Sequence, residues 1–382
     1  MSALLAEMAA KSFQLGVPFS VHLDLTYRCN ERCVHCYLDH DDHGEMTTAE
    51  IKDVLKQLAD AGVFVLVLSG GEIMLRKDIF EIVEYARELT FCVKLKTNAI
   101  LIGDREAERL RDLDIDSIQV SIYSHRPEVH DAITKVPGSL KRSLKAIRFL
   151  KSKGLKVTIA NVLMNDNAAD YAGVQQLAAQ LGIESSLDPT VTPMMNGDRS
   201  VLALNVNANE LKQVFRDPTL VENVDEFCAM PAKADEDLLE SHPCSAGHSA
   251  CYVSPYGDVY PCVQFPLPSG NVRKQKFIDI WNYSEQLNEV RSIKIRDLPN
   301  CSACGNISSC SRCPGLAYME GNMRGPSTQD CEKSYARTGI LSVNLQNRKA
   351  RGPGLVHIQG LDGRPALLQI QSPEPVAEAL SA

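Results

Sequence analysis

Three cysteines near the N-terminus are the residues best suited to chemistry. Cys29, Cys33 and Cys36 are separated by three and then two residues, after an alternating run over 19–25 that predicts a strand. Soft thiolates select iron–sulfur clusters or zinc, and a short loop can direct three of them at one [4Fe–4S] cluster. Because the triplet has no fourth cysteine beside it, one iron would stay open to a substrate or cofactor. A zinc knuckle or a redox-inert group of thiols is the alternative that this spacing leaves open.

A Gly-Gly-Glu segment at the end of a predicted strand is the second candidate for a ligand-binding site. Residues 63–68 form a continuous apolar run, which is typical of a strand buried on both faces of a parallel sheet, and Gly70, Gly71 and Glu72 follow it. Two glycines let the backbone approach a ligand closely, and a carboxylate can accept hydrogen bonds from a cationic amine.

Eight more cysteines follow residue 241 and form a second cysteine-rich region. They are Cys244, Cys251, Cys262, Cys301, Cys304, Cys310, Cys313 and Cys331. Eight thiolates divide into two sets of four, and both a [4Fe–4S] cluster and a structural zinc ion take four, so the metal stays open. Residues 254–261 alternate around a Pro/Gly turn and predict a β-hairpin. Cys92 and Cys228 stand alone and are expected to be ordinary buried thiols.

Helices and strands that alternate along the chain must position these groups. A capping box at Thr47 predicts a helix start, and further helices are predicted at 78–89, 104–112, 140–153 and 171–181. Strands are predicted at 19–25, 63–68, 91–96, 117–122, 156–162 and 183–187. This order is typical of an α/β fold with a parallel sheet, whose ligands bind at the C-terminal strand ends. The rule nominates Thr97, Asn98, Ser121, Tyr123, Asn161 and Met164. The stretch 130–139 is expected to be a loop that enters the next helix.

Composition excludes several classes of function. The chain has 382 residues, of which 44% are hydrophobic, and a net charge of −8 without a long Lys/Arg block, so nucleic acid is not an expected partner. A secretion signal and an apolar run of 18 residues are both absent from the sequence, so we expect no membrane association and a cytoplasmic location. Thirteen cysteines in such a chain favour metal ligation over disulfides.

The Cys29-x3-Cys33-x2-Cys36 motif resembles the signature of the radical S-adenosylmethionine (SAM) superfamily, and Gly-Gly-Glu resembles its SAM-amine motif, although Ile73 replaces the usual proline. The resemblance implies a partial (β/α)6 TIM-like barrel and an iron–sulfur oxidoreductase. Such enzymes cleave SAM to methionine and a 5′-deoxyadenosyl radical, which abstracts a substrate hydrogen. The resemblance assigns SAM contacts to His35, Gly70, Gly71, Glu72, Ser121 and Asn161, while Ser121 could equally be an ordinary strand residue.

The C-terminal cysteines are similar to the SPASM domain, a small cysteine-rich extension of radical SAM enzymes that mature peptides and proteins. Sulfatase maturases and the pyrroloquinoline quinone peptide cyclase belong to this group. The resemblance implies two auxiliary clusters, and therefore three [4Fe–4S] clusters in all. Auxiliary cluster I would be held by Cys244, Cys251, Cys262 and Cys313. Auxiliary cluster II would be held by Cys301, Cys304, Cys310 and Cys331. The x2 spacing between Cys310 and Cys313, where the family often has x3, is a departure that bears on their assignment.

These assignments predict five parts of the chain. They are an N-terminal helix or lid (1–18), the radical SAM partial barrel (19–195), a helical bridge (196–240), the SPASM domain (241–335) and a C-terminal tail (336–382), in which 355–370 could form a hairpin. The only tryptophan, Trp281, is expected to pack the extension onto the barrel.

The leading functional hypothesis is a maturase that oxidises a ribosomal peptide, with C–C or C–S crosslinking or a related oxidation. One alternative is a radical SAM enzyme that acts on a small molecule in cofactor or haem biosynthesis, and another is a structural metal-binding scaffold. A flavodoxin- or ferredoxin-type electron donor is an expected partner. A separate leader-binding protein is also expected, because the cluster motif begins by residue 29. The proton acceptor stays open among Tyr123, His125, Asp166 and Asp188, which lie near predicted strand ends.

Overall fold

The computed structural model describes residues 3–351, 355–359 and 365–369. The chain divides into two compact units. The first comprises Met1–Asn207 with Ser245–Ser292, and the second comprises Ala208–Cys244 with Ile293–Ala382. The five-part division predicted from the sequence remains a proposal about the organisation of the chain.

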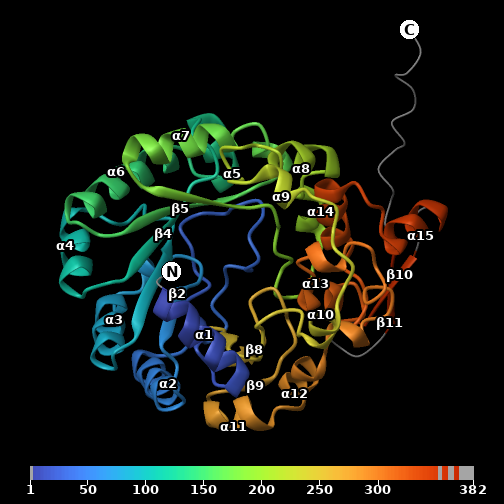
Figure 1. Ribbon diagram of the computed structural model, residues 1–382. Coiled ribbons are helices and arrows are strands. Elements are labelled where there is room, and N and C mark those ends of the chain that lie inside the picture. Colours follow the sequence, from blue (N-terminus) through green and yellow to red (C-terminus); the bar gives the residue numbers. More distant parts are fainter. Residues whose placement is uncertain (1–2, 352–354, 360–364, 370–382) are drawn as a thin grey trace. The chain divides into compact units, whose positions relative to one another are not determined.

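A nine-stranded sheet forms the centre of the first unit (Figure 1). Its strand order is β6-β5-β4-β3-β2-β1-β7-β8-β9. The first six strands are β1 (Ser20–Asp24), β2 (Val65–Ser69), β3 (Cys92–Thr97), β4 (Ser117–Ser121), β5 (Val157–Val162) and β6 (Glu184–Asp188). Consecutive strands from β1 to β6 pair in parallel with one another. The predicted α/β class and its six-stranded parallel core are therefore confirmed.

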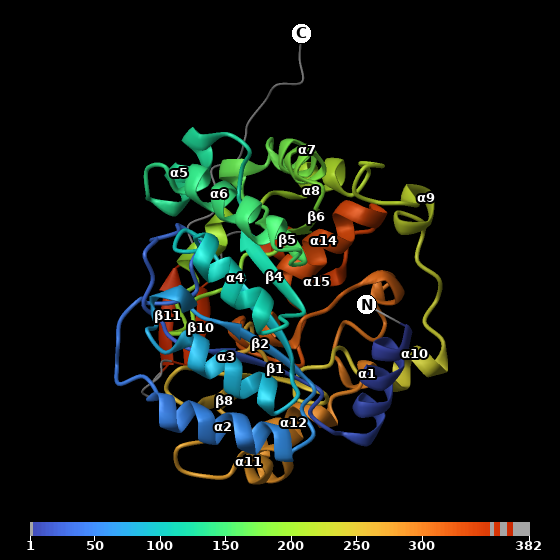
Figure 2. The ribbon, with the colours of Figure 1, turned by 90° about the vertical axis from the view of Figure 1, so that its left-hand side faces the viewer.

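Helices that connect the parallel strands lie along the outside of this sheet (Figure 2). They are α2 (Thr48–Asp60), α3 (Ile79–Glu88), α4 (Asp104–Asp112), α6 (Ser139–Ser152) and α7 (Tyr171–Leu181), with the short 3₁₀ helices η1 (Ile73–Leu75), η2 (Asn165–Asn167) and η3 (Ser200–Leu204) between elements. The predicted capping box opens α2, because the Thr47 side chain accepts from Glu50 N while the Glu50 carboxylate accepts from Thr47 N. Burial of each large aliphatic side chain against the sheet contributes roughly 1.5–3 kcal/mol, so the amphipathic pattern decides how these helices pack.

One segment differs from its sequence prediction. Part of the stretch 130–139 is not a loop, because α5 (Pro127–Thr134) is helical. Proline at the first helical position starts this helix well, since its fixed φ suits a helix and its missing N–H would have no partner there. Lys135 ends it in a left-handed conformation, with φ of 60°.

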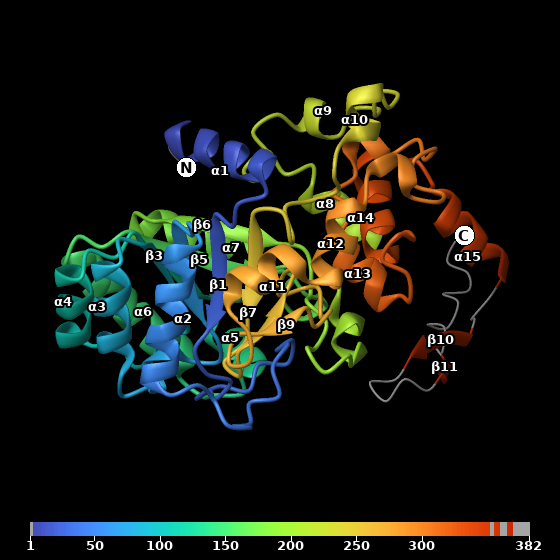
Figure 3. The ribbon, with the colours of Figure 1, turned by 90° about the horizontal axis from the view of Figure 1, so that it is seen from below.

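The region after residue 245 extends the same sheet. Strand β7 (Ala250–Val253) pairs in parallel with β1, and β8 (Asp258–Tyr260) returns antiparallel to β7, with β9 (Gly270–Asn271) beyond it (Figure 3). The predicted hairpin over 254–261 is therefore present. Helices α11 (Phe277–Tyr283) and α12 (Glu285–Ser292) follow, and Trp281 donates through Nε1 to Gly16 O at 2.8 Å, directly after α1 (Ala3–Leu15). The tryptophan thus fastens the extension to the N-terminal segment.

Short helices make up most of the second unit. They are α8 (Ala208–Val214), α9 (Val224–Phe227), α10 (Glu236–Glu240), α13 (Pro314–Met319), α14 (Thr328–Thr338), α15 (Val343–Arg351) and the 3₁₀ helices η4 (Ile295–Asp297) and η5 (Ile307–Ser309). The predicted hairpin near the C-terminus appears as β10 (Leu355–Gln359) paired antiparallel with β11 (Pro365–Gln369), and its turn lies outside the described residues. Among the helices that the structure describes, none has both the length and the apolar character needed to cross a membrane.

Candidate active site

A cavity of about 570 Å³ opens inside the first unit, at the C-terminal ends of its parallel strands. Strand-end residues Ser69, Thr97, Ser121 and Asp188 line it, as the rule for ligand sites in parallel barrels predicts. The lining also contains most of the residues assigned to SAM and its cluster. These are Cys29, Cys33, His35, Cys36, Gly70, Gly71, Ser121 and Asn161. Segments that are far apart in the sequence therefore meet at one cavity.

The cysteine loop is held in place by its backbone. Arg32 N donates to Thr134 O and Val34 N donates to Ile133 O, both at 3.0 Å, so the loop is fastened to the C-terminal end of α5. The side chain of Asn98, at the end of β3, donates to Asn30 Oδ1 at 2.6 Å. These contacts leave the three thiols partly exposed toward the cavity.

The donor set in this cavity fits an iron–sulfur cluster, because three soft thiolates line it. Among the described residues, no three Cys, His, Asp or Glu side chains lie close enough to hold one metal ion. A cubane does not require that arrangement, because each cysteine binds a different iron. Burial raises the pKa of the Cys29 thiol to about 12 and that of Cys36 to about 11, so both are protonated near neutral pH. Iron binds the thiolate, and each thiol must therefore lose its proton when a cluster is inserted. Two buried polar atoms beside these thiols, Glu31 Oε1 and His35 Nδ1, lack a hydrogen-bond partner within the described ranges.

The two glycines are required by backbone contacts. A Cβ on Gly70 would lie 2.2 Å from Thr26 O, and one on Gly71 would lie 2.3 Å from Arg28 O. Gly70 also has φ of +135°, a backbone conformation that residues other than glycine rarely adopt. The Gly-Gly pair therefore packs directly on the backbone that leads into the cysteine loop. The close approach expected toward a ligand is, in the structure, a close approach between two chain segments at the cavity wall.

Glu72 lies behind the cavity and is not part of its lining. Its side chain is fully buried, and its carboxylate accepts from Thr97 Oγ1 at 2.7 Å, Asn98 N at 2.8 Å and Met74 N at 3.0 Å. Burial raises its pKa, and these hydrogen bonds oppose that shift. In this structure Glu72 ties the end of β2 to the end of β3, and the amine contact assigned to it remains a prediction.

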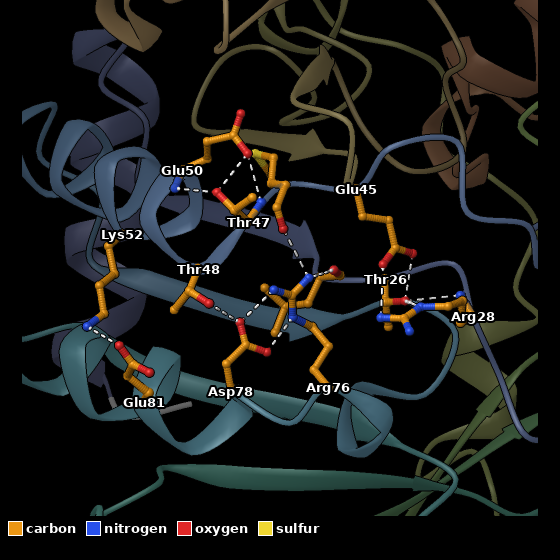
Figure 4. A network of polar contacts seen from close by, with 12 residues as sticks. Thr26, Arg28, Glu45, Thr47, Thr48, Glu50, Lys52, Arg76, Asp78 and Glu81 are labelled. Carbon is orange, nitrogen blue, oxygen red and sulfur yellow. Dashed lines mark hydrogen bonds and ion pairs between the residues drawn. The ribbon is translucent and has the colours of Figure 1, made fainter.

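A polar network behind the site braces the strand end that precedes Cys29 (Figure 4). Glu45 accepts from Thr26 Oγ1 at 2.6 Å and from Tyr27 N at 2.7 Å, and it lies 3.3 Å from the Arg28 guanidinium. Arg76 is 7% exposed and donates to Leu25 O at 3.0 Å. Asp78 pairs with Arg76 at 2.6 Å and also accepts from Thr48 Oγ1 at 2.6 Å. The network joins the end of β1, α2 and α3.

Sequence reasoning missed a histidine–aspartate pair on β1. His22 lines the cavity, and its Nε2 lies 3.1 Å from Oδ1 of Asp24, which is fully buried. Asp24 Oδ2 accepts from Tyr252 OH at 2.9 Å and from Tyr37 OH at 3.3 Å. The available signal was the alternation of His22 and Asp24 with the apolar positions 21 and 23, which places both on one strand face. Lys96 on β3 was also missed and lines the same cavity.

Of the four candidates for a proton acceptor, two line the cavity and two do not. Tyr123 and Asp188 line the cavity, whereas His125 and Asp166 are exposed and lie outside its lining. Burial raises the pKa of Tyr123 well above its usual value, which makes it a poor acceptor near neutral pH.

Comparison with known proteins agrees with this geometry. Residues 23–178 match the model of the radical SAM superfamily, and residues 244–314 match the SPASM iron–sulfur cluster-binding domain. The chain carries a radical SAM domain followed by a SPASM domain. These domains imply [4Fe–4S] clusters and SAM as cofactors.

Relatives of this radical SAM/SPASM chain carry different names. It is 28% identical to an AdoMet-dependent heme synthase of Methanosarcina barkeri, over 79% of this chain and 93% of that protein. It is 29% identical to the PqqA peptide cyclase of Xanthomonas campestris, over 89% of this chain and 93% of that protein. The structure of SuiB from Streptococcus suis bound to precursor peptide SuiA matches with a TM-score of 0.68 at 18% identity, over 85% of this chain and 79% of that chain. The last comparison supports the fold alone.

The SPASM cysteines predicted for auxiliary cluster II lie together in the second unit. Cys301, Cys304, Cys310 and Cys331 line one small cavity with Arg312 and Asp330. Its volume is about 20 Å³, which is room for little more than a water molecule, so the thiols would have to turn to admit a cluster. The structure brings these four side chains to one cavity, and their role as a ligand set remains a prediction.

The set predicted for auxiliary cluster I draws on both units. Cys251 and Cys262 belong to the first unit, whereas Cys244 and Cys313 belong to the second. Cys251 is 4% exposed on β7, and Cys262 Sγ accepts from Gln264 N at 3.3 Å. This ligand set remains a prediction.

Proposed function

We propose that the protein is a radical SAM/SPASM oxidoreductase that modifies a ribosomal peptide through C–C or C–S crosslinking or a related oxidation. The observation that carries this proposal is the meeting of three thiols, the Gly-Gly turn, Ser121 and Asn161 at one cavity. When bound there, SAM and its reduced cluster supply a 5′-deoxyadenosyl radical. The PqqA peptide cyclase is named for a peptide substrate, which supports a peptide as substrate of this protein.

Different residues around the cavity bind the cluster and the SAM ligand. Cys29, Cys33 and Cys36 hold the cluster. Asn161 is 4% exposed and accepts through Oδ1 from Asn167 Nδ2 at 3.4 Å, which leaves its own amide N–H groups to donate to a ligand. The Ser121 hydroxyl, at the end of β4, offers a second polar contact.

His22 is the best-placed acceptor for the proton that a substrate oxidation releases. The Asp24 carboxylate accepts from Nε2, so the neutral ring carries its lone pair on Nδ1. Hydrogen-atom abstraction leaves a substrate radical, and formation of the new bond then releases one proton and one electron. His22 takes the proton, and the SPASM cysteines would hold an auxiliary cluster that could supply a one-electron acceptor.

A small-molecule substrate is the second candidate. The cavity volume of about 570 Å³ lies in the range of ordinary small-molecule sites. The heme synthase relative bears a name that fits this alternative.

The proposed setting and partners follow from the chemistry. A cluster that cleaves SAM needs a potential toward the negative limit of iron–sulfur clusters, about −700 mV. We therefore propose a reducing, cytoplasmic location, a flavodoxin- or ferredoxin-type donor and a separate leader-binding protein.

The test of the proposed function uses anaerobically purified and reconstituted protein. Iron and sulfide are counted per chain, and 5′-deoxyadenosine is measured after addition of dithionite and SAM. We expect about twelve irons, which is three clusters of four. Candidate peptides incubated with the same mixture should lose two hydrogens, and mass spectrometry measures this loss.

Cys33→Ala should abolish 5′-deoxyadenosine formation, because one iron loses its thiolate. Cys92→Ala is the matched control, since Cys92 lies within β3 and outside the cavity lining, and it should cleave SAM like the wild type. Retained cleavage in Cys33→Ala, or zinc in place of iron in the wild type, would contradict the assignment.

A further inference from the structure

A buried arginine lies among the four thiols predicted for auxiliary cluster II. Arg312 is 5% exposed and lines the same cavity as Cys301, Cys304, Cys310 and Cys331. A guanidinium cannot be deprotonated in a protein, so it carries a full charge into this interior. Such burial is costly unless the charge is paired and its donors are bonded. The hydrogen bonds around Arg312 therefore show whether each of its N–H groups has a partner in this structure.

One part of the guanidinium is bonded, and another part is not. Nε and Nη2 donate to Gly325 O at 3.2 and 2.6 Å, and Nη2 also donates to Met323 O. Nη1 is buried and has no hydrogen-bond partner within the described residues. A buried donor that is left unpaired destabilises the folded protein, and more strongly when it is charged. The two carbonyls fix the guanidinium plane and leave one charged donor unsatisfied.

A buried carboxylate in the same cavity, Asp330, is paired with another cation, although its Oδ1 accepts no hydrogen bond from a described residue. Asp330 is 2% exposed and lines the same cavity. Its Oδ2 accepts from Cys313 N at 2.8 Å, and its Oδ1 lies 2.8 Å from Lys333 Nζ. Asp330 is therefore paired with Lys333, while Arg312 Nη1 stays without a hydrogen-bond partner among the described residues in the cavity that the four thiols line.

We propose that Arg312 donates through Nη1 to auxiliary cluster II and raises its midpoint potential. The proposal rests on the cluster assignment made under the proposed function. Reduction adds negative charge to a cluster, so a nearby cation in a low-dielectric interior stabilises the reduced form. Hydrogen bonds to cluster sulfurs act in the same direction and are a known lever on these potentials.

The test is a redox titration of the reconstituted full-length chain, followed by EPR, with Cys29, Cys33 and Cys36 changed to Ala to remove the SAM cluster signal. Arg312→Gln removes the charge but keeps an amide that can donate to Gly325 O, and we expect a more negative midpoint potential. Arg312→Lys keeps the charge without the planar fork and should shift the potential less. Arg324→Gln is the matched control, since Arg324 lies in the 323–325 loop that Arg312 contacts but outside the cavity lining, and it should leave the potential unchanged.

The outcomes separate the role of Arg312 from the cluster assignment. An unchanged potential in Arg312→Gln at full iron content would show that Arg312 only anchors the 323–325 loop. If Arg312→Gln loses the cluster, retention in Arg312→Lys supports the requirement for charge, whereas equal loss in both overturns it. A Cys301→Ala, Cys304→Ala double variant identifies the signal of cluster II by losing about four irons. No iron loss in that variant, or zinc at this site, would instead refute the cluster assignment.

Discussion

At the residue scale, burial rather than sequence position decides which side chains can act. His22 and His130 are both histidines near the cavity, but their environments differ. His22 lines the cavity and is paired with Asp24. His130 is 1% exposed, stacks on Tyr123 at 5.5 Å between ring centroids and accepts from Tyr123 N at 3.1 Å. The first can exchange protons with a ligand, whereas the second supports the wall of the cavity.

His130 predicts a pH dependence of stability. Burial lowers its pKa from 6.5 to about 4, so the unfolded chain binds the proton more tightly than the folded chain. Its contribution is complete above pH 6.5 and is lost as the pH falls toward 4. Between pH 7.5 and pH 5 this removes about 2 kcal/mol from the free energy of unfolding.

The check is urea unfolding of identically purified proteins at several pH values. His130→Gln should reduce this dependence by about 2 kcal/mol and leave the part that the buried His35 contributes, because burial also lowers the pKa of His35 to about 4. His125→Gln, which changes an exposed histidine, should keep the full dependence. A wild-type slope in His130→Gln would rule out His130 as its source.

At the element scale, the position of the cysteine loop depends on contacts made by neighbouring strand ends. The Gly-Gly turn after β2 packs on the backbone of Thr26 and Arg28, and Glu72 ties β2 to β3. Arg76 joins the same region from the other side through Leu25 O, Met46 O and Asp78. The cysteine loop is therefore positioned by three strands and not by its own sequence.

Arg76→Met should destabilise the protein strongly, because it leaves Asp78 and two buried carbonyls without their cation. Removal of one partner of a fully buried pair costs about 3–5 kcal/mol, and the cost here should lie toward or below the lower end because Asp78 is 20% exposed. Lys52→Met is the matched control, since Lys52 pairs with Glu81 at 2.7 Å but the two side chains are 33% and 58% exposed. An exposed pair contributes about 0–1 kcal/mol. Denaturant unfolding of both variants measures the difference, and equal effects would show that the network in Figure 4 has no special role.

At the scale of the whole molecule, the radical SAM part and the SPASM part are not two separate sheets. Strand β7 pairs with β1 over Ser20–Leu23, so the extension continues the sheet that holds the cavity. Val263 and Gln264, which follow Cys262, line that cavity. The SPASM segment therefore contributes directly to the wall of the proposed active site.

This arrangement predicts the behaviour of Cys262→Ala. SAM cleavage should continue, because the Cys29, Cys33 and Cys36 loop is untouched, while formation of the modified product should be lost. Comparison of 5′-deoxyadenosine with product by liquid chromatography and mass spectrometry measures this uncoupling. Product formed at the wild-type rate would mean that a cluster at Cys262 is structural or absent.

Much of the local structure was encoded in local sequence patterns. The helices Asp104–Asp112 and Tyr171–Leu181 have the predicted bounds, and the capping box at Thr47 forms as predicted. Helical periodicity and capping depend on residues within a few positions of one another, so one sequence suffices to identify them. The prediction that residues 130–139 form a loop was wrong for residues 130–134, because a short helix that starts at a proline carries little periodic signal.

By itself, the sequence limited the cofactor to a thiolate-bound iron–sulfur cluster or zinc, since the spacing of cysteines limits which groups they can bind. Its resemblance to the radical SAM superfamily then indicated [4Fe–4S] clusters and SAM. Only the tertiary structure decided that His22 and Lys96 line the cavity, that Glu72 lies behind it and that Arg312 lies among four thiols. These facts depend on which residues meet after folding. Pairing between β1 and β7 joins segments more than two hundred residues apart, and no short-range pattern specifies it.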